Sequence, residues 1–280
     1  MHETMSFEQV SRILESSQER AELAQAAVFL ANSDGVMALR QLGRYLTRAD
    51  FLARLDNLEE PHEKTLYLRQ VMAPLIERPS PEVAALCHTL YRDATFMSDP
   101  DRLVFLLRAL AAVSPMSGAT AEIFRQTNAI GYYSHNAPLL AANASPAALE
   151  VLEQMIRDAR VPAERRIDAL HEGVLPNRSK APVLQMCRRL IESELELPVK
   201  SGVIESVFDY QGKKWYGPHP PKPPAWRSAS NEVLRLVAEL AGVAREQPGL
   251  PDALRDAIDD TARVVRALLT GRSRVPPAAG

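Results

Sequence analysis

The sequence is poor in the residues on which disulfide frameworks, metal clusters and β-sheets depend. It contains only two cysteines, Cys87 and Cys187, and only seven Phe, seven Tyr and two Trp in 280 residues. Each cysteine lies on an apolar stripe with helical spacing, so we expect two buried thiols and neither a disulfide framework nor a metal cluster. Because strands draw on aromatic and β-branched residues, scarce aromatics beside abundant Ala and Leu favour helices.

The chain also lacks a long hydrophobic run and an excess of either charge. Its longest apolar stretch, 103–113, is short and contains Arg108, so no membrane span is expected. The first residues show no basic flank followed by an apolar core, and we expect a cytoplasmic protein. With 33 basic residues, 35 acidic residues and a formal net charge of −2, the composition argues against a protein built mainly to hold phosphate backbones.

Sequence signatures of cofactor and metal enzymes are missing as well. No G-x-G occurs, so neither a dinucleotide fingerprint nor a P-loop is present. His-Glu pairs at His2, His62 and His171 begin like the H-E-x-x-H zinc motif, but none has a histidine four residues on. No G-x-S-x-G nucleophile elbow occurs either. We therefore expect neither a cofactor nor a metal.

What the sequence does contain is a regular spacing of prolines. Pro146 and Pro182 are 36 residues apart, as are Pro162 and Pro198, and 16 residues separate the two prolines within each set. Proline is tolerated in the first turn of a helix, where its missing N–H would have no partner and its fixed φ suits the helix. The spacing therefore predicts four helix starts and a two-helix unit that repeats every 36 residues.

Apolar residues between these prolines keep helical spacing. A two-helix unit with one apolar stripe cannot bury that stripe alone, so consecutive units are expected to stack on one another. The stripe of the first helix recurs 35 residues later, as Leu149, Leu152, Met155 and Ile156, then as Leu184, Cys187, Leu190 and Ile191.

The second helix of the first unit resembles the P-x-x-V-R-x-x-A-L core of HEAT-type repeats. Pro162, Arg166, Ala169 and Leu170 match that core, while Arg165 stands in the usual valine position. The resemblance implies an all-α fold, a right-handed α-solenoid of stacked antiparallel helix pairs. It also implies that Arg166 pairs with a carboxylate of a neighbouring unit.

Other copies of this core are degenerate. Near the C-terminus, Pro251, Leu254 and Arg255 keep the spacing, and Arg255 is expected to pair as Arg166 does. In the middle copy, Gly202 occupies the arginine position after Pro198. The alternative to a solenoid is an irregular bundle of the same proline-capped helices with a globular outline.

The predicted organisation has three parts. Residues 1–79 form a helical cap or diverged repeats, 80–270 form HEAT-like repeats, and 271–280 form a flexible tail. Capping and breaking residues place further helices, at about 7–30, 36–45, 47–55, 61–75, 82–96, 101–113, 120–131, 228–245 and 251–270.

The segment 211–227 is the first candidate binding site. It carries five prolines and both tryptophans, and it interrupts the 36-residue spacing by seventeen residues. Insertions in stacked repeats project from one edge, and Trp and Tyr supply rigid amphipathic surface. The alternative is that the tryptophans fold inward as a cover. The candidate partner-binding residues are Lys213, Lys214, Trp215, Tyr216, His219, Trp226 and Arg227 in this segment, together with Arg165.

A polar aromatic cluster at 131–136 is the second candidate. It is predicted to lie at a helix junction and to line a pocket, with His135 as an acid or base and Tyr132 or Tyr133 stacking on a ligand. Asn136 completes the set. The alternative is a packed turn without a ligand.

Three functions compete on this basis. The leading hypothesis is a non-enzymatic adaptor that binds a protein or peptide partner on a helical surface. HEAT-like repeats also form DNA glycosylases, so a nucleic-acid-acting enzyme using Trp215, Trp226 and Asp209 is an alternative. A small-molecule enzyme using the 131–136 cluster is the third.

Overall fold

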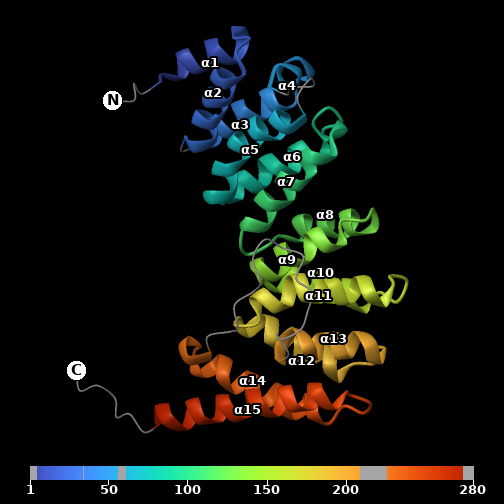
Figure 1. The fold of residues 1–280 in the computed structure, drawn as a ribbon. Coiled ribbons are helices and arrows are strands. Elements are labelled where there is room, and N and C mark those ends of the chain that lie inside the picture. Colours follow the sequence, from blue (N-terminus) through green and yellow to red (C-terminus); the bar gives the residue numbers. More distant parts are fainter. Residues whose placement is uncertain (1–4, 34, 56–60, 209–225, 274–280) are drawn as a thin grey trace, which may run out of the picture. The chain divides into compact units, whose positions relative to one another are not determined.

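The protein is helical throughout the residues that its computed structural model describes, which are 5–33, 35–55, 61–208 and 226–273. Within these ranges every regular element is an α-helix or a 3-10 turn (Figure 1). The prediction of an all-α fold is thereby confirmed. By internal contacts the chain divides into two compact units, residues 1–120 and 121–280, with the boundary in the first turn of one helix.

The first unit contains the helices up to that boundary. They are α1 (Phe7–Ser16), α2 (Arg20–Asn32), α3 (Val36–Leu46), α4 (Ala49–Leu55), α5 (Pro61–Glu77), α6 (Pro81–Arg92), the 3-10 turn η1 (Phe96–Ser98) and α7 (Pro100–Ala112).

The second unit begins within the next helix. Its elements are α8 (Gly118–Ala129), α9 (Tyr133–Asn143), α10 (Pro146–Arg157), α11 (Ala163–Asn177), α12 (Ala181–Glu192), α13 (Leu197–Phe208), the 3-10 turn η2 (Trp226–Ser228), α14 (Asn231–Arg245) and α15 (Asp252–Ser273).

All four prolines of the 36-residue spacing lie at helix starts, as predicted. Pro146 is the first residue of α10, while Pro182 and Pro198 are the second residues of α12 and α13. Pro162 is the N-cap of α11. The fixed φ of proline and its missing N–H favour it at these positions, although Pro74, Pro138 and Pro176 lie inside α5, α9 and α11.

Polar caps fix several of the other helix starts. The Ser6 hydroxyl and the Gln9 side chain form the predicted capping box at the start of α1. Ser80, Asp99 and Ser230 each accept a hydrogen bond from a backbone N–H in the first turn of α6, α7 and α14. These bonds satisfy N–H groups that have no partner within the helix.

Two predicted helices had wrong boundaries. The helix expected over 7–30 breaks into α1 and α2, because the Ser17 hydroxyl accepts from the Glu19 N–H and holds the backbone extended. The helix expected over 82–96 ends at Arg92, where the Asp93 carboxylate accepts from the Phe96 N–H instead. Short polar side chains compete with the helix for backbone donors at such positions.

In the second unit the helices pack in two rows. Helix α11 packs between α9 and α13, and α13 also contacts α15. The other row is α10, α12 and α14, with α12 in the middle (Figure 1). The two 36-residue copies are therefore adjacent, and the predicted apolar stripes of α10 and α12 are buried between the rows.

A buried ion pair and a close backbone contact join successive helix pairs here. The Arg166 side chain is 2% exposed, and its Nη2 lies 2.8 Å from Oε1 of Glu196, just before α13. This is the pairing that the HEAT resemblance implied. A Cβ built on Gly173 of α11 would lie 2.8 Å from the Ala137 carbonyl oxygen, so α9 and α11 touch backbone to backbone. By contrast, Arg255 is exposed on α15.

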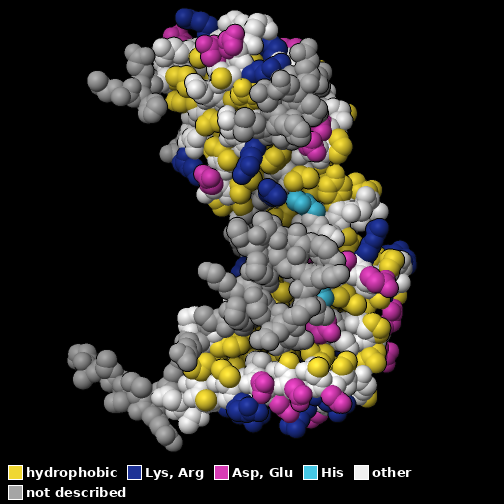
Figure 2. Space-filling model, in the orientation of Figure 1, with side chains coloured by type: hydrophobic (Ala, Val, Ile, Leu, Met, Phe, Trp, Pro, Cys, Tyr) yellow, Lys and Arg dark blue, Asp and Glu magenta, His cyan; other side chains and the backbone are white. Residues whose placement is uncertain are grey.

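The open face of α15 is charged. Exposed residues on it include Arg255, Asp256, Asp260, Arg263 and Arg266, and Figure 2 shows basic and acidic side chains mixed over this helix. A polar outer face is what a terminal helix pair needs where no further pair covers it.

The first unit shows similar rows without the proline spacing. Helix α5 packs between α2 and α7, while α3 packs against both α2 and α6. Each unit holds one of the two cysteines, Cys87 in α6 and Cys187 in α12, and both are fully buried. The prediction of buried thiols is thereby confirmed, and burial raises the pKa of each thiol to about 12.

Candidate functional site

The second unit carries an open groove of about 690 Å³ between α8 and α10. Although both helices lie wholly within the described residues, they do not pack closely as α10 and α12 do. The gap between them is therefore left for a ligand or solvent. The residues that line this α8–α10 groove are Arg125, Asn128, Ala129, Tyr133, Val151, Gln154, Met155, Arg157, Asp158, Arg160 and Val161.

Helix α10 supplies the floor of the groove and much of one wall. Val151, Gln154, Met155 and Asp158 follow one another at helical spacing, so they share one face of the helix. Val151 and Met155 are buried, which makes the floor apolar, whereas Gln154 is exposed at the rim. The groove thus combines an apolar base with polar edges, the usual composition of a binding site for an organic ligand or a peptide.

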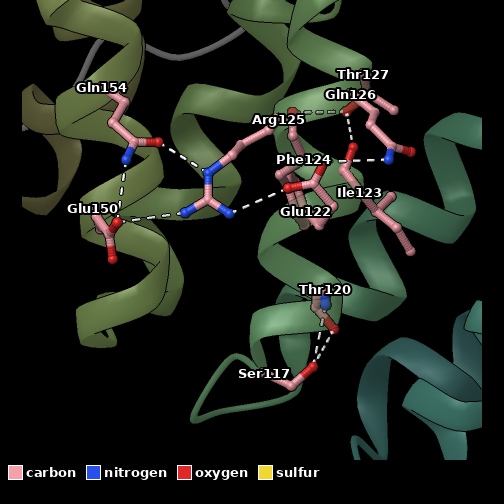
Figure 3. Close-up of polar contacts among 10 residues, drawn as sticks. All are labelled: Ser117, Thr120, Glu122, Ile123, Phe124, Arg125, Gln126, Thr127, Glu150 and Gln154. Carbon is pink, nitrogen blue, oxygen red and sulfur yellow. Dashed lines mark hydrogen bonds and ion pairs between the residues drawn. The ribbon is translucent and has the colours of Figure 1, made fainter.

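Arg125 of α8 bridges the groove to α10 (Figure 3). Its Nε donates to Oε1 of Gln154 at 2.9 Å, and its Nη2 lies 3.5 Å from Oε1 of Glu150. On its own helix, Nη1 lies 3.4 Å from Oε2 of Glu122. The bridging guanidinium ties the two walls together, and its positive charge is balanced by carboxylates on both sides.

Tyr133, the first residue of α9, places a hydroxyl group at the groove. Its side chain is only 7% exposed, and the described residues offer its buried hydroxyl no hydrogen-bond partner. Burial raises the pKa of the phenol and the nearby Asp158 carboxylate raises it further, against a smaller opposite effect of Arg166. The hydroxyl therefore stays protonated, and it lies beneath the surface of the groove.

Carboxylates neutralise the other two arginines of the groove. Arg160 forms a two-pronged pair with Asp158, with hydrogen bonds of 2.8 and 2.9 Å. These bonds from Arg160 hold the pKa of Asp158 below its ordinary value. Arg157 lies 2.8 Å from Glu153, so the groove has little unpaired positive charge.

Most of the predicted partner-binding segment lies outside the described residues. This applies to Lys213, Lys214, Trp215, Tyr216 and His219, and also to Asp209. Trp226 and Arg227 belong to η2, which contacts α15, and the Trp226 side chain is half-buried. Arg165 is exposed on α11 beside the buried Arg166. Neither Trp226 nor Arg165 lines the α8–α10 groove.

The 131–136 cluster is split by the start of α9. The sequence predicted a junction of poor helix formers, but the helix begins at Tyr133 and includes His135 and Asn136. Of the four candidates, Tyr133 alone lines the groove. Tyr132 is the N-cap, with its ring against His135 at 6.4 Å between centroids.

Asn136 is linked to the groove by a hydrogen bond to the side chain of Asn128. It is fully buried, and its Nδ2 donates to Oδ1 of Asn128 at 2.7 Å and to Oγ1 of Thr127 at 2.9 Å. Since Asn128 lines the groove, Asn136 fixes the orientation of a lining side chain without lining the groove itself.

Sequence reasoning missed the charged residues of the groove. Arg125, Arg157, Asp158 and Arg160 belong to helix surfaces that look like ordinary solvated faces in the sequence. They form a site only because α8 and α10 face each other across a gap. The one usable signal was the placement of Tyr133 beside the repeat.

Three further tests of function concern metal sites, membrane-spanning helices and similarity to known proteins. Among the described residues, no group of three or more His, Cys, Asp or Glu side chains could hold a metal ion. In the same part of the chain no helix has the length and apolar character to cross a bilayer. No protein-family model, curated protein or solved structure matches this chain.

Proposed function

We propose that this chain is a HEAT-like helical-repeat adaptor, an α-solenoid that holds a segment of a protein partner in the α8–α10 groove. The observation that carries the proposal is the groove itself, which is open, has an apolar floor and polar rims, and lies beside stacked helix pairs. Stacked helix pairs commonly present such surfaces to extended partners, and this step from architecture to use is an analogy.

The repeat assignment is supported by three features of the second unit. The helix pairs recur at 36 residues with proline starts, neighbouring pairs contact each other in two rows, and Arg166 reaches Glu196 of the next pair. A charged outer face on α15 suits a terminal repeat.

The charge balance of the groove favours a peptide over a nucleic acid. A phosphate backbone is held by clustered, unpaired cations. Here Arg125, Arg157 and Arg160 each have a carboxylate partner within the protein. An extended peptide, in contrast, supplies backbone N–H and carbonyl groups for Asn128 and Gln154 at the rim and apolar side chains for the groove between them.

Peptide display on the full chain tests this proposal. Ala129, an exposed lining residue at the end of α8, is replaced by Trp to fill the groove, and exposed Ala119 of the same helix is replaced as the matched control. We expect peptides selected on the wild type to bind Ala119→Trp equally and Ala129→Trp at least about tenfold more weakly, a loss of about 1.4 kcal/mol. Circular dichroism confirms that both variants fold.

Two results would overturn the proposal. One is equal peptide binding by the wild type and Ala129→Trp. The other is salt-sensitive binding of duplex DNA that persists in Ala129→Trp, which favours the nucleic-acid-acting alternative.

A further inference from the structure

The first unit carries a second groove, between α3 and α6, that the proposed function does not use. It consists of two adjoining hollows of about 350 and about 490 Å³, which share Val36, Leu39 and Glu82. The residues that line the larger part of its length are Val36, Leu39, Arg40, Gly43, Arg44 and Thr47 of α3 and its end, with Glu82, Ala85, Leu86 and Thr89 of α6.

The lining follows a complete stripe along each helix. On α3 the stripe runs from Val36 to Thr47, a length of about 16 Å at the rise of an α-helix. On α6 it runs from Glu82 to Thr89 at the same helical spacing. The groove therefore extends for about three helical turns along α3 and about two along α6.

Small residues make the floor of the α3–α6 groove shallow and apolar. A Cβ built on Gly43 would lie 2.9 Å from Cδ1 of Leu86, so the two helices approach closely there. Leu39 and Leu86 are mostly buried below, while Ala85 and Val36 remain exposed to a ligand. Apolar surface of this kind is stabilised by an apolar partner.

The charge along the rims is unequal. Arg40 and Arg44 are exposed along the α3 rim, and Arg78 lines the adjoining hollow, where it donates to the Asn32 carbonyl. Among the described residues of the two linings, Glu82 is the one acidic side chain. An occupant with carboxylates beside its apolar stripe therefore matches this groove better than a neutral or basic one.

We infer that the α3–α6 groove binds an acidic amphipathic helix of a partner protein. Its leucine-type side chains pack on Leu39, Ala85 and Leu86, and its flanking carboxylates meet Arg40 and Arg44. The apolar floor favours such a helix over a nucleic acid, whose backbone offers no apolar stripe. The chain then has a second interaction surface, independent of the α8–α10 groove.

Fluorescence anisotropy of the full chain with designed peptides tests this inference. The probe is a labelled peptide of roughly fifteen residues, long enough to form a helix, with leucine on one face and glutamate beside it. Its control carries lysine in place of glutamate. We expect the wild type to prefer the glutamate peptide by about tenfold, since two exposed ion pairs contribute up to about 1.4 kcal/mol together.

Two kinds of variant test the α3–α6 groove: one reverses the charges on its rim, and the other fills its floor. Arg40→Glu with Arg44→Glu is expected to reverse the preference, so that the lysine peptide binds better. The control reverses Arg12 and Arg69, two exposed arginines of the same unit outside the groove, and keeps the wild-type preference. Ala85→Trp fills the floor and abolishes binding of both peptides, while Ala129→Trp leaves it unchanged.

Several outcomes would overturn the inference. Equal binding of the two peptides by the wild type excludes the charge match. An equal loss in the Arg12 and Arg69 control shows that net charge alone acts. If a glutamate peptide without leucines binds as well as the probe, the peptide is held by surface charge alone and not by the apolar groove. If duplex DNA displaces the bound glutamate peptide, the site takes phosphate ligands.

Discussion

The two units build similar rows of helices with different connecting contacts. In the second unit, the buried Arg166 binds a carboxylate of the next helix pair. In the first unit, the largely buried Arg54 of α4 donates to the backbone carbonyls of Ser17 and Leu14 at 2.7 and 3.1 Å. The Arg166 guanidinium joins two helix pairs through a side chain, and the Arg54 guanidinium satisfies carbonyls at the end of α1.

The two units also offer a comparison between two glycines at close helix contacts. Gly173 of the second unit faces a backbone carbonyl, whereas Gly43 of the first unit faces the end of a leucine side chain. A backbone contact cannot relax, while a side-chain tip can. Side-chain contacts of the Gly43 kind also occur in the second unit, at Gly202 and Gly249, so Gly173 is distinguished by its contact with backbone.

Arg166→Ala is expected to have the largest effect, because it removes a large buried side chain and leaves a cavity. We expect the second unit to lose about 3 kcal/mol through lost packing, since Glu196 is half-exposed and is rehydrated. Arg255→Ala, at the same motif position but exposed on α15, should change stability by less than about 0.5 kcal/mol.

Pulsed cysteine labelling measures this loss in each unit separately. Both thiols are buried with a pKa of about 12, so each reacts only when its unit opens. Labelling of Cys187 should accelerate about 100-fold in Arg166→Ala, a factor that corresponds to about 3 kcal/mol. Equal acceleration at Cys87 would contradict the independence of the two units.

Gly173→Ala is expected to cost about 2 kcal/mol, since its new Cβ meets the Ala137 carbonyl at 2.8 Å. Gly43→Ala should cost less than about 1 kcal/mol, because the tip of Leu86 can move. Gly242→Ala, at an exposed position of α14 with nothing within 4 Å of the new Cβ, should instead gain about 0.5–1 kcal/mol. Urea unfolding followed by circular dichroism gives all three values. A loss in Gly43→Ala as large as in Gly173→Ala would show that the contacts are equally rigid.

The smallest expected effect is on the pH dependence of stability, through the carboxyl group of Glu153. Burial favours the neutral form of Glu153, but hydrogen bonds from Arg189 and Arg157 outweigh it and lower the pKa of this carboxyl below 4.5. Its contribution to stability is therefore present above the unfolded pKa and lost as the pH falls through the lower folded pKa. The second unit loses stability at acidic pH, which is measured as faster labelling of Cys187. In Glu153→Gln this loss should be smaller than in the wild type, by less than about 1 kcal/mol. Unchanged acid sensitivity in this variant would exclude Glu153 as its source.

The sequence predicted much of the secondary structure because helix starts are local events. Pro146, Pro182 and Pro198 begin helices through their fixed φ, and Ser80 and Ser230 cap others with a single hydroxyl. The prediction was wrong where a short side chain competed for the backbone, as Ser17 does between α1 and α2.

Most residues of the candidate sites, in contrast, could not be predicted from the sequence. Tyr133 was predicted as a site residue, and it lines the α8–α10 groove, but Arg125, Gln154 and Asp158 gave no signal. Their role depends on the gap between α8 and α10, a distance that no local pattern encodes. The same holds for Arg40 and Arg44, which look like any solvated helix face in the sequence.

By itself, the sequence determined the all-helical fold, the 36-residue spacing of helix starts and the buried thiols. These follow from backbone geometry and from periodic burial, which neighbouring residues specify. Only the tertiary structure decided which helices leave a gap, which polar groups stay unpaired there and which glycines allow contact. Such features depend on the separation of helices far apart in the chain, and packing of whole surfaces sets that separation.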